Sequence, residues 1–140
     1  MEGVFLKNLK RINNSKGDIL HALKKSESTY KEFGEAYFSL INYDQIKGWK
    51  KHTKMTMNLI VPVGEIKFVL YDNRDNKIKP IFSEFIIGES NYKRLTIPPN
   101  VFVSFKGLDK KMNLLLNIAD LEHDPDEAIN LELEKINYNW

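Results

Sequence analysis

The chain has 140 residues, of which 42% are hydrophobic and 29% charged, a balance typical of a folded globular protein. Its 21 Lys and Arg residues against 19 Asp and Glu residues give a net charge of +2, which is too small to predict binding to nucleic acid or to an anionic membrane. The absence of cysteine excludes disulfide scaffolds, thiol nucleophiles and cysteine-based zinc sites.

The start of the chain lacks the apolar segment of a signal peptide, and no stretch approaches the roughly 20 apolar residues that cross a bilayer. No linker, repeat or low-complexity segment divides the sequence. We therefore expect one domain over residues 1–140, located in the cytoplasm, with neither a membrane nor nucleic acid as a partner.

The amino-terminal segment gives a helical signal, because Asp18 precedes a short mixed stretch and could cap a helix over residues 19–25. Short runs rich in aromatic and branched residues follow, separated by turn signals. They cover residues 36–41, 57–61, 65–71, 81–87, 101–105 and 112–118. In the third run Ile66, Phe68 and Leu70 alternate with other residues and share one face, as in a strand.

A second helical signal lies near the carboxyl end, where Asp124 and Pro125 are the residue types of a helix cap and first turn. Helical turns are thus expected only near the two ends of the chain. Many short strands at roughly ten-residue spacing predict an all-β antiparallel sandwich or barrel between them.

Two segments resemble the signatures of the cupin family. Residues 46–64 contain a glycine-flanked strand with His52 and a closing Gly64, and residues 98–103 begin with a proline, like the second cupin signature. The order and spacing of motifs over most of the chain are similar to those of the dTDP-4-dehydrorhamnose 3,5-epimerases and related sugar ketoisomerases. These motifs are Ser15-Lys16-Gly17-Asp18, Glu35-Ala36-Tyr37-Phe38-Ser39, Lys47-Gly48-Trp49-Lys50, Asp72-Asn73-Arg74, Leu95-Thr96-Ile97-Pro98 and residues 136–140. The resemblance implies a cupin-type double-stranded β-helix, or jelly-roll, barrel.

The metal ligands of cupins are missing from the corresponding positions. By spacing, Lys50 stands at the first histidine position, Met57 at the glutamate position and Val103 at the histidine position of the second signature, so that only His52 remains. A lysine in place of a ligand opposes a bound cation. We therefore expect no metal and no other cofactor, with an unconventional metal set of His52, His21 and a carboxylate as a less favoured alternative.

The resemblance implies chemistry without a metal, in which a base removes a proton beside the 4-keto group of a nucleotide-linked sugar. Lys50 stands at the family's catalytic histidine position, Met57 at its lysine position, and Glu122-His123 near its catalytic tyrosine. Because these residues differ from the family pattern, epimerisation at the usual two carbons does not follow from the resemblance alone.

Other residues can supply the proton transfer. Strand alternation places Lys50 and His52 on one face, and if that face lines the barrel, His52 is the candidate base and Lys50 a second base or an enolate stabiliser. The alternative is a hydrogen-bonded barrel histidine beside a lysine that extends into solvent. His123 is the further acid or base candidate, although a histidine in such a turn is more often an ordinary surface residue.

Basic and aromatic residues provide candidates for binding the nucleotide sugar. Lys16, Lys47 and Arg74 stand at or near the family's diphosphate-facing positions, where charge-assisted hydrogen bonds suit a diphosphate. Tyr37 and Trp49 could stack on the base or sugar, with core packing as the alternative for at least one of them.

The leading hypothesis is an epimerase or isomerase that acts on a nucleotide-linked 4-keto-6-deoxyhexose in bacterial surface-polysaccharide biosynthesis. The resemblance also implies a homodimer in which amino-terminal strands are exchanged. The alternative hypothesis is a non-catalytic cupin that binds a sugar or a nucleotide sugar.

Overall fold

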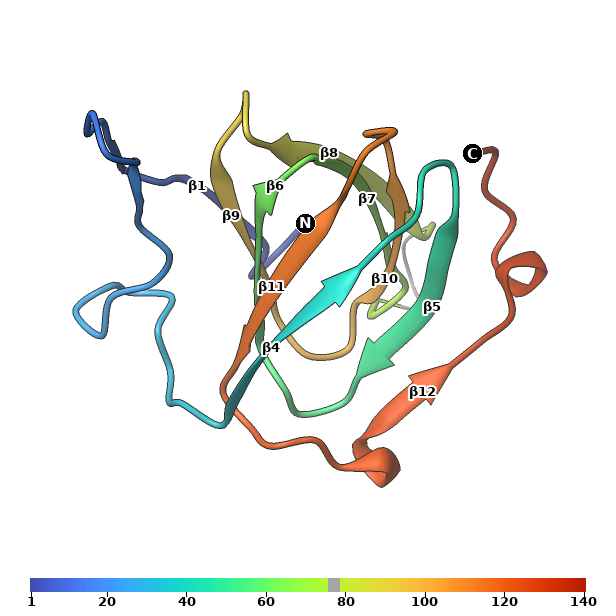
Figure 1. Ribbon diagram of the computed structural model, residues 1–140. Coiled ribbons are helices and arrows are strands. Elements are labelled where there is room, and N and C mark those ends of the chain that lie inside the picture. Colours follow the sequence, from blue (N-terminus) through green and yellow to red (C-terminus); the bar gives the residue numbers. More distant parts are fainter. Residues whose placement is uncertain (76–78) are drawn as a thin grey trace.

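The computed structural model describes residues 1–75 and 79–140. Two five-stranded antiparallel sheets face each other and enclose the core (Figure 1). The first sheet contains, in spatial order, β1 (Phe5–Asn8), β9 (Lys93–Ile97), β6 (Met57–Val63), β11 (Leu114–Ala119) and β4 (Glu35–Leu40). The second contains β12 (Ala128–Asn130), β5 (Ile46–His52), β10 (Phe102–Gly107), β7 (Glu65–Asp72) and β8 (Ile81–Gly88).

The core lies between the two sheets. Ile66, Phe68 and Leu70 of β7 are fully buried, as their alternation predicts, and they belong to one cluster with Leu59 and Val61 of β6 from the facing sheet. In the described residues, helical structure is limited to two short 3-10 turns, η1 (Pro125–Glu127) and η2 (Leu133–Lys135). The predicted all-β cupin-type barrel with short helical turns is confirmed.

The predicted strands coincide with β4, β6, β7, β8, β10 and β11. The capped turn is also confirmed, since the Asp124 carboxylate accepts the Asp126 backbone N–H at 2.9 Å and Pro125 begins η1. The predicted helix over residues 19–25 is wrong. Ile19 and Leu20 form β3 (Ile19–Leu20), which pairs with β2 (Arg11–Ile12), while Asp18 accepts a hydrogen bond from Arg11 at 2.7 Å and closes this hairpin.

The segment that follows this hairpin is anchored to the outer side of the first sheet. Arg94 of β9 is fully buried, and its guanidinium donates to the carbonyl of Ala22 at 2.8 Å and to the hydroxyl of Thr29 at 2.7 Å. It also forms an ion pair with Glu27 at 2.6 Å. The hairpin itself extends beyond the barrel, at the left of Figure 1.

The carboxyl-terminal segment lies along the outer side of β5 (Figure 1). Trp49 and Leu131 exchange two backbone hydrogen bonds of 2.9 Å, and the Trp49 indole donates to the carbonyl of Leu133 at 3.3 Å. The rings of Tyr138 and Trp140 pack at 6.5 and 6.1 Å from that of Trp49. This aromatic cluster fixes the terminal segment against the strand that carries the candidate site.

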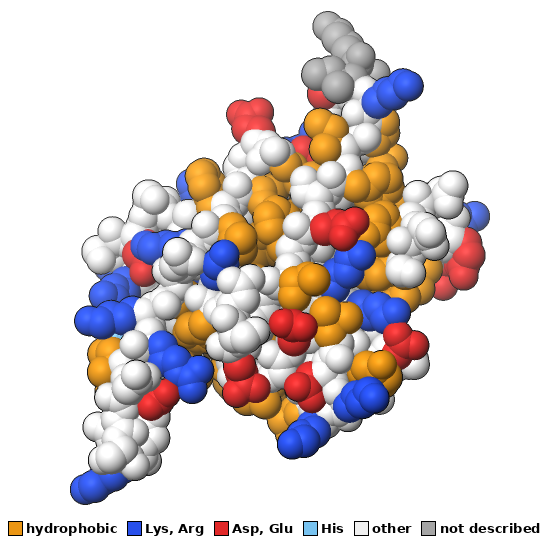
Figure 2. Space-filling view, turned by 90° about the horizontal axis from the view of Figure 1, so that it is seen from above, with side chains coloured by type: hydrophobic (Ala, Val, Ile, Leu, Met, Phe, Trp, Pro, Cys, Tyr) orange, Lys and Arg blue, Asp and Glu red, His pale blue; other side chains and the backbone are white. Residues whose placement is uncertain are grey.

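On the face seen in Figure 2, positive and negative side chains are interspersed with hydrophobic ones. No area of a single charge dominates that face, in keeping with the small net charge. Within the described part of the chain, no helix has the length and apolar character needed to cross a membrane.

Candidate active site

A bulge in β5 aligns two lysines on one face. Lys50 opposes Val103 of β10 and Lys47 opposes Phe105, so three steps along β5 match two steps along β10. Without the extra residue, an odd spacing would place the two lysines on opposite faces of the sheet. Gly48 makes the bulge possible, because its φ is +131° and a Cβ there would lie 2.7 Å from the Cα of Ser104.

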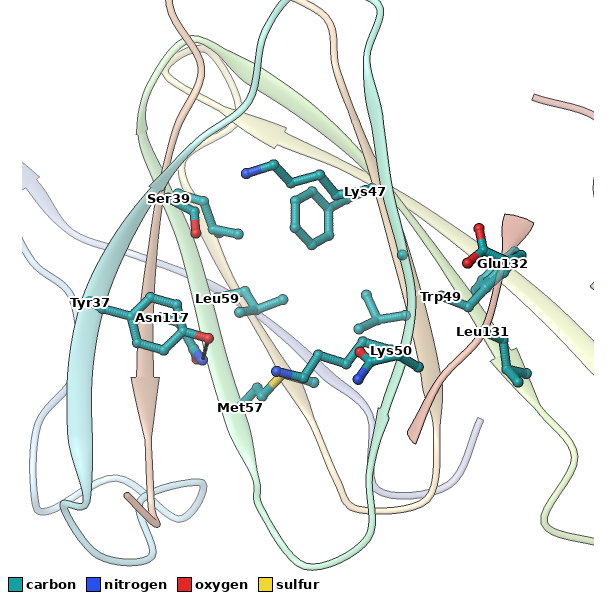
Figure 3. A pocket seen from close by; sticks show the side chains of 15 residues that line it. Tyr37, Ser39, Lys47, Trp49, Lys50, Met57, Leu59, Asn117, Leu131 and Glu132 are labelled. Atoms are coloured by element: carbon teal, nitrogen blue, oxygen red, sulfur yellow. Dashed lines mark hydrogen bonds between the residues drawn. The ribbon is translucent and has the colours of Figure 1, made fainter. Parts of the chain in front are cut away.

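Both lysines line a pocket of about 420 Å³ inside the barrel. Apolar side chains from both sheets form much of its wall; they are Met57, Leu59, Val103, Phe105 and Leu115. Figure 3 shows Lys47 and Lys50 extending from β5 into this space, with Tyr37, Ser39 and Asn117 on the facing wall. The arrangement is a largely apolar cavity with a few convergent polar groups, which is the usual form of a small-molecule site.

The two lysine amines differ in their partners. Nζ of Lys47 donates to the carbonyl of Leu40 at 2.9 Å. Nζ of Lys50 makes no hydrogen bond or ion pair with any residue in the described ranges. On the facing wall, the amide of Asn117 donates to the hydroxyl of Tyr37 at 3.1 Å. Among the described residues, the pocket therefore contains one lysine held by a backbone carbonyl and one lysine without a hydrogen-bond partner.

A buried histidine–carboxylate pair lies at the end of β5, two residues beyond Lys50. His52 is 2% exposed, and its Nδ1 is hydrogen-bonded to Oε1 of Glu127. The other oxygen of Glu127 accepts the backbone N–H groups of Thr53 at 3.0 Å and Lys54 at 3.1 Å. Nε2 of His52 is buried and has no hydrogen-bond partner among the described residues.

The surroundings of the pair set its protonation. Burial lowers the pKa of His52 below its ordinary value, and the positive charge of Lys50 adds to this, while Glu127 acts in the opposite direction. Burial alone would raise the pKa of Glu127, but hydrogen bonds from His52 and from the backbone outweigh it and lower that pKa. The pair is therefore a neutral imidazole beside an ionised carboxylate. Because a carboxylate only accepts, Nδ1 carries the proton and Nε2 the lone pair.

The structure gathers only part of the predicted site. Lys47, Lys50, Tyr37 and Trp49 all line the pocket, although the ring of Trp49 lies on the far side of β5 in the aromatic cluster (Figure 3). His52 shares the face of Lys50 but is not part of the pocket lining.

The remaining candidates lie away from the pocket. Lys16 is exposed in the β2–β3 hairpin, and His123 is exposed in the loop before η1. Arg74 pairs with Asp72 at 2.7 Å and donates to the carbonyl of Glu2 at 2.7 Å. The roles of all these residues stay predictions. In residues 1–75 and 79–140 no group of three His, Cys, Asp or Glu side chains is placed to hold a metal ion.

Sequence reasoning did not select Glu127 or Asn117. Asn117 had a usable signal, because it stands between Leu115 and Ala119 on the buried face of β11. A polar residue at such a position requires a partner or a function. Glu127 had no local signal, because it lies 75 residues from His52 and its neighbours read only as the start of a helical turn.

No protein-family model matches the chain. A dTDP-sugar isomerase from Desulfovibrio desulfuricans G20 superposes with a TM-score of 0.93 and 33% sequence identity, over 99% of this chain and 91% of that one. The chain belongs to the dTDP-sugar isomerase family. The chain is also 27% identical to the spore coat polysaccharide biosynthesis protein SpsL of Bacillus subtilis, over 100% of this chain and 96% of the relative.

A dTDP-4-dehydrorhamnose 3,5-epimerase from Sulfolobus tokodaii has the same fold as this isomerase-family chain, with a TM-score of 0.80 and 18% identity over 99% of this chain and 82% of that one. The resemblance seen in the sequence motifs is thus confirmed, and the barrel is that of a sugar isomerase or epimerase.

Proposed function

We propose that this protein is an epimerase or isomerase of a nucleotide-linked 4-keto-6-deoxyhexose, which acts by proton abstraction without a metal in bacterial surface-polysaccharide biosynthesis. The observation that carries the proposal is the Lys50 side chain in the barrel pocket, which has no partner among the described residues and shares its strand with His52 of the His52–Glu127 pair. The names of the dTDP-sugar isomerase and of SpsL support the substrate class and the pathway. A cytoplasmic location remains part of the proposal.

The chemistry follows from the acidity of protons beside a ketone. A base removes the proton at C3 or C5, and positive charge near the carbonyl oxygen stabilises the enolate. Lys50 supplies that charge inside an apolar pocket, where it is screened less than in water. We assign the role of base to Nε2 of His52, which lies on the face of Lys50 just beyond the pocket lining, and Glu127 orients the imidazole and stabilises its protonated form.

Epimerisation also needs a proton donor on the other face of the sugar. Tyr37 projects from β4 on the wall that faces β5, and its oxygen accepts a hydrogen bond from Asn117. The hydroxyl proton is therefore available for a ligand in the pocket. We assign Tyr37 as this donor in addition to its predicted contact with the sugar.

The residues predicted to contact the diphosphate lie in different places, one in the pocket, one in the amino-terminal arm, which is the β2–β3 hairpin, and one at the end of β7. Lys47 lines the pocket and can meet a diphosphate there. Lys16 lies in the hairpin that extends beyond the barrel, so an exchange of arms in a homodimer would carry it toward the pocket of the other protomer. Arg74, at the end of β7, is held by Asp72 and would have to exchange that partner for the phosphate.

The test is deuterium incorporation at C3 or C5 of a dTDP-4-keto-6-deoxyhexose in heavy water, followed by NMR. Wild type should exchange one or both positions, and His52→Gln should lower the rate by about 100-fold or more. A complete lack of exchange over a panel of such sugars would contradict the proposed epimerase or isomerase activity.

The second candidate is a non-catalytic cupin that binds the nucleotide sugar. Met57 favours it, because this apolar residue lines the pocket at the position where the family resemblance places a catalytic lysine. That function predicts a ligand-dependent rise in melting temperature without any deuterium exchange.

A further inference from the structure

Lys50 differs from the other lysine of the pocket because it has no hydrogen-bond or ion-pair partner in the part of the chain that the structure describes. Lys47 is held by the carbonyl of Leu40 at 2.9 Å, whereas the amine of Lys50 contacts no acceptor or carboxylate among the described residues. Lys50 projects toward Met57 and the centre of the cavity (Figure 3). A ligand in the pocket therefore meets a lysine side chain that has no competing partner among the described residues.

The next residue on this face of β5 is a histidine whose ring is oriented by a carboxylate. Lys50 and His52 lie on the same face of β5, where alternate residues repeat at roughly 7 Å, a distance that a lysine side chain can span. The Nε2 atom of His52 has no hydrogen-bond partner in residues 1–75 and 79–140, and its Nδ1 is hydrogen-bonded to Glu127. A nucleophile, a base and a group that orients the base are together the usual arrangement for activating a nucleophilic side chain.

The substrate class supplies a matching electrophile, since the proposed function places a ketone in the same pocket. Lysine amines condense with ketones to form Schiff bases. We propose that Lys50 forms a Schiff base with the 4-keto carbon of the nucleotide sugar, so that proton abstraction proceeds through an enamine rather than a free enolate. The inference rests on the proposed function and adds a covalent step to it.

The step balances without a further reactant. The C4–N bond forms and the C4–O bond breaks, and the lysine ammonium and the ketone together give a protonated imine and one water molecule. The two protons that leave the nitrogen depart with the carbonyl oxygen, and His52 transfers them. Loss of the C3 or C5 proton then gives the neutral enamine. Reprotonation and addition of water restore the ketone and the ammonium.

The covalent step requires lysine at position 50 and cannot be carried out by arginine. An enolate stabiliser needs only positive charge, which Lys50→Arg retains, but a guanidinium forms no Schiff base under these conditions. Lys51 provides the matched control, because it is adjacent in sequence but lies on the other face of β5, with its amine 4.5 Å from the ring centroid of Phe102.

The experiment treats the protein with dTDP-4-keto-6-deoxyglucose and sodium cyanoborohydride, which reduces imines in preference to ketones. Intact-mass and peptide mass spectrometry then locate any adduct, while deuterium exchange is measured in parallel without the reductant. We expect a stable adduct on the peptide of Lys50 in wild type and in Lys51→Arg, and none in Lys50→Arg. Exchange should fall by about 100-fold or more in Lys50→Arg. Circular dichroism and melting temperature check that each variant is folded.

The outcomes distinguish the two proposals. Exchange by wild type with no adduct, or exchange that persists in Lys50→Arg, overturns the Schiff base and leaves the epimerase or isomerase intact. An adduct on Lys47 overturns the assignment to Lys50. A lack of both exchange and adduct in wild type overturns the proposed function and the Schiff base together.

Discussion

At the scale of single residues, the proposed role of His52 as the base predicts the pH range of the reaction. The imidazole must be neutral to accept a proton, and burial lowers its pKa below the ordinary value of about 6.5. His52 therefore stays neutral as the pH falls through about 6.5, and it becomes protonated only at lower pH. The acid limb of the exchange rate should have its midpoint below about pH 6.5.

Glu127→Gln tests the origin of that limb. The carboxylate raises the pKa of His52 against the effect of burial, so its removal should move the acid limb to still lower pH. The rate on the plateau should fall by about 10-fold or more, because the amide does not stabilise a protonated imidazole. The measurement is the pH profile of deuterium exchange, with Asp126→Asn, an exposed neighbour, as the control. An unchanged limb in a folded Glu127→Gln would contradict the role of the pair.

At the scale of secondary-structure elements, the bulge in β5 decides which side chains reach the pocket. Gly48→Ala should destabilise the fold by about 1–3 kcal/mol, because it combines a positive φ with a Cβ that would lie 2.7 Å from Ser104. Gly17→Ala is the matched control. It also has a positive φ, of +127°, but its Cβ would meet nothing within 4 Å.

Urea unfolding of the two variants measures the difference in their free energies of unfolding. Gly48→Ala should lose more stability than Gly17→Ala, since only the former requires a shift of the neighbouring strand. It should also lose deuterium exchange, because relief of the contact displaces Lys47 and Lys50. Equal losses of stability would show that backbone conformation, rather than the close approach to β10, makes glycine necessary.

The same elements show what the sequence could predict. Alternation was enough for β7 and for the shared face of Lys50 and His52, because each depends only on local periodicity. It could not align Lys47 with Lys50, since the bulge is defined by pairing with β10. The helix predicted after Asp18 failed because Arg11, on the facing strand, takes that carboxylate. Glu127 reaches His52 only through the pairing of β12 with β5.

At the scale of the whole molecule, β4 serves two surfaces at once. Tyr37 and Ser39 face the pocket, whereas Phe38 and Leu40 face outward and are 63% and 59% exposed. Leu116 and Leu114 of β11 stand directly beside these two residues and widen the apolar surface. An apolar surface of this kind on an edge strand is typical of a contact with another protein.

We propose that this surface, together with the amino-terminal β2–β3 hairpin, forms the contact between protomers of the predicted homodimer. Phe38→Lys should then shift the protein from dimer to monomer, because the charge would be buried against the partner without a counterion. Light scattering coupled to size-exclusion chromatography measures the mass directly. Ile86→Lys is the control, since Ile86 is 46% exposed on β8 of the other sheet and should leave the dimer intact. A wild-type monomer at all concentrations, or a dimer that survives Phe38→Lys, would contradict this interface.

Since Tyr37 adjoins Phe38, loss of the dimer should also slow deuterium exchange, whereas Ile86→Lys should not.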